Sequence, residues 1–242
     1  MQPTQFSKNF KEKSINQFKR MFLMNEIKGY LRDFRIDVPR VIYDCPGIKI
    51  FGRVIKSIVF STDVSIIRNC NADAVIAVYP FTPQPVITQA VMMAADCPVF
   101  VGVGGGLTKG ERVINLARHA EYQGATGVVL NAPTTNESIN DVFKVVDLPI
   151  VITVVKEEDI QARLDAGAQI LNVSAAAKTP ELVSKIRREF PTVPIMATGG
   201  PTEESIRATI EAGADAITWT PPTNGEVFRD IMEIYRKGNP HP

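Results

Sequence analysis

The stretch MATGGPTEESIRATIEAGADAITWT, residues 196–220, contains one complete structural unit of the chain. It begins with a short apolar run, passes through a glycine pair into a segment with helical spacing, and returns through Gly213-Ala214-Asp215 to a second apolar run. This order predicts a strand, a helix and a second strand parallel to the first. The pair Gly199-Gly200 follows the first strand, so it is either a phosphate-binding turn or only the bend that a strand–helix connection requires.

The same unit recurs through residues 56–242. Small-residue corners and single prolines alternate as the points where apolar, β-branched runs begin, which is typical of strands covered on both faces. The corners are Asn71-Ala72-Asp73, Gly124-Ala125-Thr126, Gly167-Ala168-Gln169 and Gly213-Ala214-Asp215, and the prolines are Pro98, Pro149 and Pro194. With Lys56–Thr62 as the first strand, the pattern predicts the α/β class and a single (β/α)8 TIM barrel. We place its strands near residues 57–61, 73–79, 98–103, 126–131, 149–154, 169–174, 194–198 and 215–219.

Residues 1–55 form an N-terminal helical arm and a lead-in segment to this barrel. Residues 1–40 carry nine Lys and Arg against four Asp and Glu, although the whole chain of 242 residues has a net charge of only +1. Phe10, Phe18, Phe22 and Ile27 recur at helical spacing and predict a helix over residues 8–34, with an extended piece around residues 40–52. We expect the helix to pack on the barrel or across a homo-oligomer, with an acidic partner or a membrane surface as the alternative.

Composition excludes several classes of protein. With 45% hydrophobic and 22% charged residues the chain is of ordinary globular type, and it has no apolar run of the roughly 20 residues that a membrane span needs. The N-terminal residues lack the apolar core of a secretory signal, and the basic arm lacks the aromatic and arginine density of a nucleic-acid surface. Cys45, Cys70 and Cys97 have neither metal-ligand nor paired spacing, so we expect reduced thiols in a cytoplasmic protein.

Position along each unit separates structural residues from candidate site residues. In such barrels the loops after the strands carry the chemistry, whereas the corners before the strands serve stability, so Asp73 and Asp215 are predicted to be structural. The strand ends are rich in hydroxyls, amides and glycines. They hold Ser61–Asp63, Tyr79–Thr82, Gly104–Glu111, Asn131–Thr135, Thr153–Lys156, Asn172, Ser174, Lys178, Thr198–Gly200 and Thr218–Gly225. His119 and His241 both lie away from strand ends, so we predict no metal and no cofactor.

From this inventory we select two sets of residues. The predicted ligand-binding residues can approach or donate to an anion: Gly104, Gly105, Gly106, Lys109, Asn131, Ser174, Thr198, Gly199 and Gly200. The predicted catalytic residues are Lys156, at the start of a helix, Lys178 and Asp63. Each has a plain alternative, since the glycines could form a flexible loop, the lysines could lie on the surface, and Asp63 could cap a helix.

VPIMATGGPTEESIRATIEAGADAI, residues 193–217, resembles the corresponding segment of the ribulose-phosphate-binding barrel superfamily. That group includes ketodeoxyphosphogluconate aldolases, thiamine phosphate synthases and thiazole synthases, and the resemblance implies an anion held at Gly199 and Gly200. The chain departs from the group at several points. Pro221 and Pro222 have no N–H to donate, the strand QILNVS has no Schiff-base lysine, and VFVGVGGG lacks the decarboxylase Asp-x-Lys-x-x-Asp.

These residues suit a polar or anionic small molecule. We therefore expect a lyase or isomerase of a small phosphorylated or carboxylated metabolite, in which a lysine acts as base, electrostatic stabiliser or Schiff-base former. The scarcity of acid and base groups favours an alternative, a barrel that binds such a metabolite as a sensor or assembly component without converting it. A third, weaker alternative is a barrel that binds FMN through its phosphate.

Overall fold

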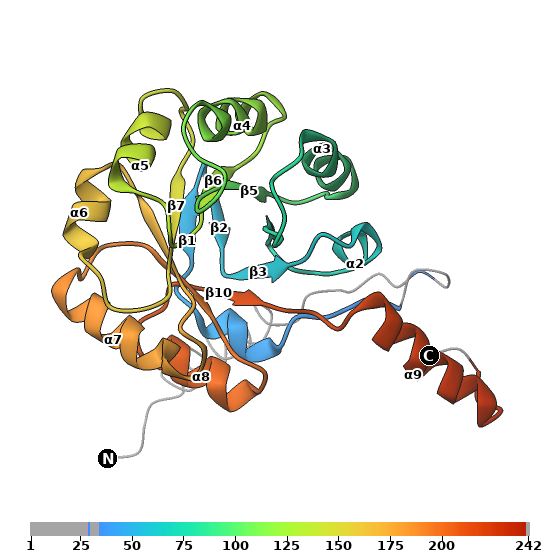
Figure 1. Ribbon diagram of the computed structural model, residues 1–242. Coiled ribbons are helices and arrows are strands. Elements are labelled where there is room, and N and C mark those ends of the chain that lie inside the picture. Colours follow the sequence, from blue (N-terminus) through green and yellow to red (C-terminus); the bar gives the residue numbers. More distant parts are fainter. Residues whose placement is uncertain (1–28, 30–33, 241–242) are drawn as a thin grey trace, which may run out of the picture. The chain divides into compact units, whose positions relative to one another are not determined.

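The protein is described by a computed structural model that covers residue 29 and residues 34–240 (Figure 1). Eight parallel strands close into a barrel in the order β10-β3-β4-β5-β6-β7-β8-β9. They are β3 (Ser57–Phe60), β4 (Ala74–Ala77), β5 (Val99–Gly104), β6 (Gly127–Leu130), β7 (Ile150–Val154), β8 (Ile170–Val173), β9 (Ile195–Thr198) and β10 (Ala216–Trp219). The predicted (β/α)8 barrel is confirmed, and every predicted strand end lies within two residues of the observed one.

Helices alternate with the strands and cover the outside of the barrel (Figure 1). They are α2 (Val64–Arg68), α3 (Pro85–Ala94), α4 (Glu111–Tyr122), α5 (Asn136–Phe143), α6 (Ile160–Asp165), α7 (Thr179–Glu189), α8 (Glu203–Glu211) and α9 (Asn224–Arg236), with a 3-10 turn η2 (Ala176–Lys178) before α7. Helix α6 begins at Ile160 because Asp159 caps it, so our placement of Lys156 at a helix start is wrong. None of the helices in the described ranges is both long and apolar enough to span a membrane.

Successive residues of each strand point alternately into the barrel and toward the helices. Ile58, Phe100, Val129 and Val151 belong to a buried cluster inside the barrel. Their strand neighbours, such as Val59, belong to a second cluster that lies between the strands and the helices. The barrel therefore has a solid apolar core over its lower part, as such folds require.

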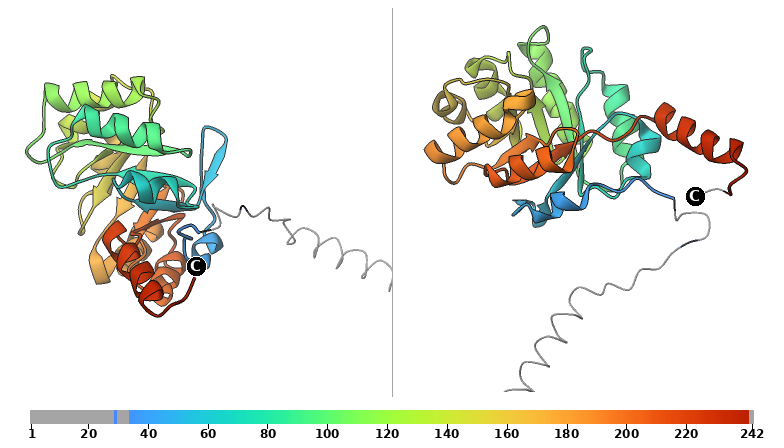
Figure 2. Two further views of the ribbon diagram at one scale, coloured as in Figure 1. Left: turned by 90° about the vertical axis from the view of Figure 1, so that its right-hand side faces the viewer. Right: turned by 90° about the horizontal axis from the view of Figure 1, so that it is seen from below.

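The lead-in segment closes the lower end of this core. The antiparallel hairpin of β1 (Ile48–Ile50) and β2 (Arg53–Ile55) places Ile48, Ile50 and Ile55 in the cluster inside the barrel. Figure 2 (left) shows the hairpin at one end of the barrel. Before it, Arg40–Asp44 form the 3-10 helix η1, so the extended conformation that we predicted there is wrong for these five residues.

The corners before the strands bind the lower rim together. Asp73 Oδ2 accepts hydrogen bonds from the amides of Lys56 and Ser57, both at 2.9 Å. Asp215 Oδ2 accepts from the Ile195 amide at 2.8 Å and from Arg187 Nη2 at 2.6 Å. Because both carboxylates are bound to the start of a neighbouring strand, the structural role predicted for Asp73 and Asp215 is confirmed.

The chain divides into two compact units, residues 1–34 and residues 35–242. The helix predicted over residues 8–34 lies almost wholly outside the described residues. In the second unit, α9 extends beyond the barrel wall and has no buried residue (Figures 1 and 2). Phe228 and Met232 are exposed on it at 62% and 42%, so an apolar part of α9 faces solvent.

Candidate functional site

A pocket opens at the upper end of the barrel, where the inward-facing side chains change from apolar to polar. Above Val151, Ile170, Met196 and Ala216 in the core, the next inward positions on the same strands are Thr153, Asn172, Thr198 and Thr218. The pocket has a volume of about 310 Å³. We call it the central pocket, and it is lined by Phe60, Ile76, Val78, Asn131, Thr153, Asn172, Ser174, Thr198, Thr218 and Thr220.

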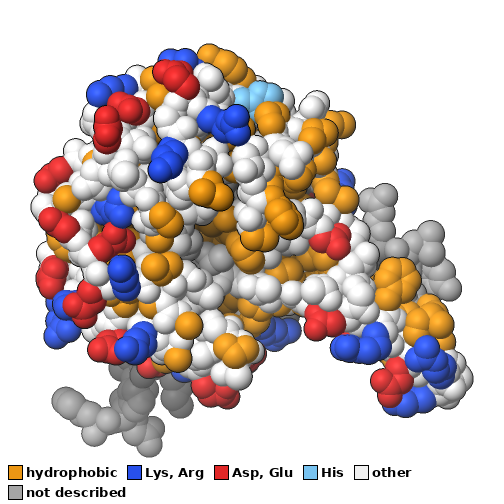
Figure 3. Space-filling view, viewed as in Figure 1, with side chains coloured by type: hydrophobic (Ala, Val, Ile, Leu, Met, Phe, Trp, Pro, Cys, Tyr) orange, Lys and Arg blue, Asp and Glu red, His pale blue; other side chains and the backbone are white. Residues whose placement is uncertain are grey.

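No ionisable side chain is among the residues that line the central pocket. Figure 3, which looks onto this end of the barrel, shows Lys, Arg, Asp and Glu side chains around the periphery of the face and uncharged surface at its centre. The site therefore combines a neutral interior with a charged rim. A ligand that reaches the interior meets hydroxyl and amide groups only.

Two polar groups in the central pocket are buried without a partner in the protein. Asn172 is 8% exposed, and its Oδ1 accepts no hydrogen bond, while its Nδ2 donates to Thr153 Oγ1 at 3.4 Å. Thr218 is 5% exposed, and its Oγ1 is likewise unpaired. Buried polar groups are nearly always satisfied in folded proteins, and leaving one unpaired costs about 1–3 kcal/mol. Both groups are therefore candidates to bind a ligand.

A second depression, the rim groove, adjoins the central pocket beside β9 and β10. It has a volume of about 630 Å³ and shares Thr198, Thr218 and Thr220 with the central pocket. Its other lining residues are Gly200, Pro201, Trp219, Pro221, Pro222, Glu226, Arg229 and Asp230. Arg229, on α9, is the cation of this groove, and its Nε lies 3.4 Å from Asp230 Oδ1 in an exposed pair.

Backbone amides near the glycine pair differ in availability. The Gly199 amide donates to the Thr218 carbonyl at 3.3 Å. The N-terminus of α8 is capped by its own side chains, because Thr202 Oγ1 accepts from the Ser205 amide and Ser205 Oγ accepts from the Thr202 amide. Gly200 has a φ of +80°, and a Cβ there would lie 2.6 Å from Ser205 Oγ. Glycine is thus required at position 200 by the turn itself.

The glycine triplet packs against a neighbouring loop. Gly104, Gly105 and Gly106 all have positive φ values, and the Gly105 amide donates to the Thr108 carbonyl at 3.0 Å. A Cβ on Gly105 would meet Asn131 Cβ at 3.0 Å, so the absence of a side chain lets this loop lie directly on the Asn131 loop. At Gly104 and Gly105 the close backbone approach is therefore to protein, whereas a Cβ on Gly106 would meet nothing nearer than Pro133 at 3.9 Å. Lys109 follows in the same loop and is exposed.

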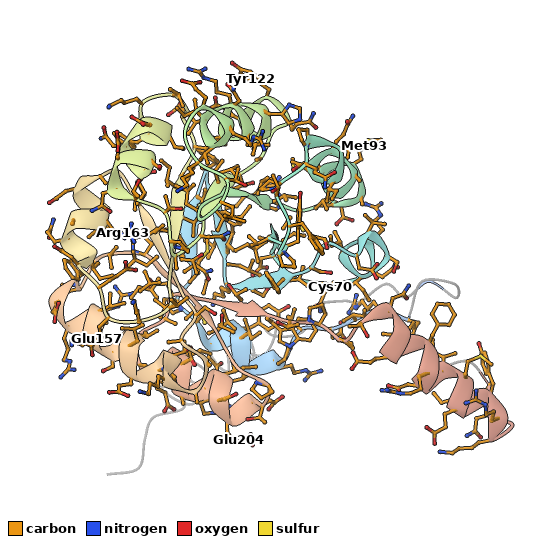
Figure 4. The ribbon with its side chains drawn as sticks, viewed as in Figure 1. Cys70, Met93, Tyr122, Glu157, Arg163 and Glu204 are labelled. Atoms are coloured by element: carbon orange, nitrogen blue, oxygen red, sulfur yellow. The ribbon has the colours of Figure 1, made fainter. Side chains whose placement is uncertain are left out.

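The two candidate catalytic lysines lie together in a separate cleft. Lys156 and Lys178 line this lysine cleft, of about 390 Å³, with Val155, Glu157, Ala175, Glu181, Leu182 and Lys185. Both side chains are exposed. Glu157, which Figure 4 labels, accepts a hydrogen bond from Lys185 Nζ at 2.5 Å. Lys156 lies after the end of β7 and Lys178 ends η2, so both lie beyond the strands and outside the rows of inward-facing side chains.

Asp63 serves as the N-cap of α2. Its Oδ1 accepts from the Ser65 hydroxyl at 2.7 Å, from the Ser65 amide at 2.9 Å and from the Ile66 amide at 3.3 Å. The hydrogen bond from the Ser65 side chain is the main cause that lowers the pKa of Asp63, and the Ile66 and Ser65 amides add to it. The carboxylate thus stabilises the start of a helix.

Arg163 fixes the loop that carries Asn131. This side chain of α6, labelled in Figure 4, donates to Glu158 Oε2 at 2.8 Å from Nη2 and at 3.0 Å from Nε. It also donates to Asn136 Oδ1 at 3.0 Å, to the Ala132 carbonyl at 3.2 Å and to the Thr134 carbonyl. Sequence reasoning did not select Arg163, because an arginine within a helix gives no sign of its distant partners.

The structure thus divides the predicted site residues among several places. Asn131, Ser174 and Thr198 line the central pocket, and Thr198 Oγ1 donates to Ser174 Oγ at 3.1 Å. Gly200 lines the rim groove, and Lys156 and Lys178 line the lysine cleft. Selection from the sequence missed Asn172 and Thr218, although both belonged to the strand-end inventory. Their place on the inward-facing parity of β8 and β10 is the signal that would have found them.

Comparison with known proteins gives fold-level likenesses. No family model matches the chain, and no curated protein matches it. A candidate phosphonomutase from Burkholderia cenocepacia J2315 is 16% identical with a TM-score of 0.59, over 76% of this chain and 92% of that one. The phosphoenolpyruvate phosphomutase of Streptomyces platensis subsp. rosaceus is 13% identical with a TM-score of 0.56, over 83% and 87%.

A third solved structure bears on the resemblance found in the sequence. The thiamine phosphate pyrophosphorylase of Pyrococcus furiosus is 19% identical with a TM-score of 0.53, over 68% of this chain and 84% of that one. The chain shares their barrel fold. The predicted likeness to barrels of this kind is therefore confirmed for the architecture, and at such identities the comparison shows the fold alone.

Proposed function

We propose that this protein is a lyase or isomerase that acts on a small phosphorylated or carboxylated metabolite at the upper end of the barrel. The observation that carries the proposal is the central pocket, where Asn172 Oδ1 and Thr218 Oγ1 are buried without a protein partner. Unsatisfied polar groups in a barrel mouth are expected where a ligand completes their hydrogen bonding. Among the structural neighbours are proteins named as a phosphomutase and a thiamine phosphate pyrophosphorylase, which supports a phosphorylated ligand.

We assign the anionic group of this metabolite to the rim groove. There the Gly200 amide donates to the anion, the Thr198 hydroxyl turns from Ser174 to donate as well, and Arg229 supplies the positive charge. Gly199 shapes the turn, since its amide is bonded to the Thr218 carbonyl. We assign the countercharge to Arg229 and not to Lys156 or Lys178, because Arg229 lines the groove that contains Gly200, whereas the two lysines line another cleft.

For the catalytic step the proposal retains three candidates from the sequence. Lys156 and Lys178 are cations near the strand ends that could act as a base or Schiff-base former after loop movement, and Asp63 is the carboxylate next to β3. Lys109 and the glycine triplet remain proposed ligand contacts from the neighbouring loop. We further propose a cytoplasmic homo-oligomer with no nucleic-acid partner, assembled through the arm of residues 1–34.

One observation favours a second function, binding without conversion. The described residues that line the central pocket include no acid or base, so a ligand held there has no adjacent group for proton transfer. A barrel of this kind would serve as a sensor or assembly component.

A thermal-shift screen with phosphorylated and carboxylated metabolites tests the proposed site. We expect compounds with one anionic end to raise the melting temperature, and the Arg229→Met variant to lose this effect while it remains folded. Arg236→Met, which removes an exposed arginine from the same helix, is the matched control. Equal shifts of the melting temperature in the wild type and Arg229→Met would show that the anion does not bind in the rim groove.

Conversion is tested separately from binding. Every compound that binds is incubated with the enzyme and followed by mass spectrometry, and 2-oxo acids are also incubated with borohydride to trap a Schiff base. Turnover that is lost in Lys156→Met or Lys178→Met, with binding retained, supports a lyase or isomerase. Tight binding without turnover or trapping would establish the binding function instead.

A further inference from the structure

Helix α3 differs from the other helices around the barrel because it carries no charged residue. The whole stretch of residues 74–95 contains no Lys, Arg, Asp, Glu or His. Each of the other helices from α2 to α9 in the described part of the chain has at least one charged residue. Helices at a protein surface normally place charged and polar side chains on the side that faces water. The outer side of α3 is therefore not that of an ordinary solvated helix.

Within the subunit, α3 is packed on three sides. Val91 is 0% exposed and belongs to the apolar cluster between the strands and the helices. Helices α2 and α4 lie on either side of α3 and contact it (Figure 1). The side that remains is open to solvent and consists of Val86, Gln89, Ala90 and Met93, which we call the α3 face.

The α3 face has an apolar side chain near each end. Val86 and Met93 are 67% and 79% exposed, and Met93, labelled in Figure 4, points away from the barrel. Figure 3 shows hydrophobic side chains at the edge of the molecule where α3 lies. Charged residues are depleted and methionine is enriched at the centre of protein–protein interfaces, and exposed apolar patches mark such surfaces. The α3 face thus has the composition of an interface.

The spacing of these residues makes the α3 face complementary to itself. Val86, Ala90 and Met93 follow one another by four and three residues, so they form one stripe along the helix. If two copies of α3 pack antiparallel about a twofold axis near Ala90, Val86 of each copy meets Met93 of the other. The small side chain of Ala90 lets the two helices approach closely at the axis. Gln89 has both the donor and the acceptor that a second Gln89 requires.

We propose that the α3 face joins two copies of this chain in a twofold-symmetric dimer. A charged partner gains no ion pair from this face, because residues 74–95 offer no charge. An anionic lipid surface is disfavoured for the same reason, since helices that lie on such surfaces carry Lys and Arg beside their apolar side. The self-complementary stripe identifies a second copy as the occupant. This interface is separate from the arm of residues 1–34, so the two can be tested independently.

The size of the α3 face determines how strong the dimer should be. Standard protein–protein interfaces bury roughly 1,200 Å² or more, and one pair of ten-residue helices supplies less. We therefore expect a reversible dimer with a micromolar dissociation constant. The mass measured by light scattering should accordingly rise with concentration between about 1 and 300 µM subunit.

Ala90→Glu tests the interface without a change to the fold. Ala90 is exposed in the single subunit and glutamate is a good helix former, so the melting temperature should equal that of the wild type. Two carboxylates would meet at the twofold axis, so we expect association to weaken at least about hundredfold. The mass at the highest concentration should fall toward half of the wild-type value, whatever assembly the arm adds. Ala208→Glu, which alters an exposed alanine within α8, is the matched control and should retain the wild-type mass.

A mixture of two variants tests the antiparallel geometry. Ala90→Lys alone should also fail to associate, because two ammonium groups would meet at the axis. When Ala90→Glu and Ala90→Lys are mixed in equal amounts, association should return, since each carboxylate then meets an ammonium group. Gln89→Glu keeps the shape of the side chain but removes the paired amides, so it should weaken association as well.

Three results would overturn this proposal. The first is a wild-type protein that keeps the mass of one subunit up to about 300 µM. The second is an Ala90→Glu mass equal to that of the wild type, which would leave the arm as the interface of any assembly observed. The third is an equal mixture of Ala90→Glu and Ala90→Lys that remains dissociated, because two copies of Ala90 would then not meet at the axis.

Discussion

Replacement of Arg163 by methionine tests whether the site depends on the hydrogen bonds that this side chain makes to Glu158 and to the Asn131 loop, which together we call the clamp. The guanidinium is 13% exposed and its partner Glu158 is 19% exposed, and the same group holds the carbonyls of Ala132 and Thr134. Methionine retains most of the buried stem but removes all of the donors. The Glu158 carboxylate and the two carbonyls then lose their partner in a place that water reaches poorly.

The expected loss follows from this degree of burial. Removal of one partner from a fully buried ion pair costs about 3–5 kcal/mol, and the residual exposure of Arg163 and Glu158 lets water compensate part of it, so we expect about 2–4 kcal/mol. For a chain of this length each kcal/mol lowers the melting temperature by about 2–4 °C, which predicts a decrease of roughly 4–16 °C.

The assay compares two arginines by chemical denaturation and calorimetry. Arg207→Met is the matched control, since Arg207 and its partner Asp44 are 55% and 61% exposed and lie 3.5 Å apart, and it should cost less than about 1 kcal/mol. Since the clamp fixes the loop that brings Asn131 to the central pocket, Arg163→Met should also weaken ligand binding. Equal stabilities of the two variants would refute the reasoning.

Three further predictions concern other parts of the chain. Hydrogen bonds in the folded state lower the pKa of Asp63, so its contribution to the free energy of unfolding is present above the unfolded pKa of about 3.9 and is lost as pH falls. Asp63→Asn retains the cap, and it should therefore flatten the dependence of stability on pH in that acidic range. Burial raises the pKa of Cys45 to about 12 and of Cys97 to about 11, so iodoacetamide at about pH 8 should label both far more slowly in the native than in the urea-unfolded protein, as peptide mass spectrometry will show. Deletion of residues 1–34, which keeps the bridge between Ile36 and Cys70, should lower the oligomeric state in light scattering, and an unchanged mass would contradict a role of the arm in assembly.

The barrel could be predicted from the sequence because its signal is local and repeated. Each strand is a continuous apolar run with a small-residue corner or a proline before it, and this pattern follows directly from burial on both faces. The hairpin of residues 48–55 escaped prediction because its apolar residues, Ile48, Ile50 and Ile55, are too few to show a period. Their burial depends on the interior of a barrel that forms far away along the chain.

The candidate site was predicted only in part, for a related physical reason. Positions at and just after the strand ends can be recognised from the sequence, which is why Asn131, Ser174 and Thr198 were selected. Whether a side chain lies in the pocket depends on strand parity and on which distant groups satisfy it. Asn172 is important because its Oδ1 has no partner, and Arg163 because it makes five hydrogen bonds to four residues. Neither the missing partner of Asn172 nor the distant partners of Arg163 can be recognised from the residues next to them in the sequence.

The β1–β2 hairpin also determines from which end of the barrel a ligand can enter and leave. Because Ile48, Ile50 and Ile55 fill the lower end, the central pocket is a dead end in the part of the chain that the structure describes. If the protein is the proposed lyase, its substrate enters and its products leave past the same strand ends. A reaction that splits its substrate there must release the fragment nearer the rim first and the deeper fragment last. The deeper fragment would then be a competitive inhibitor of the substrate, and the outer one a noncompetitive inhibitor.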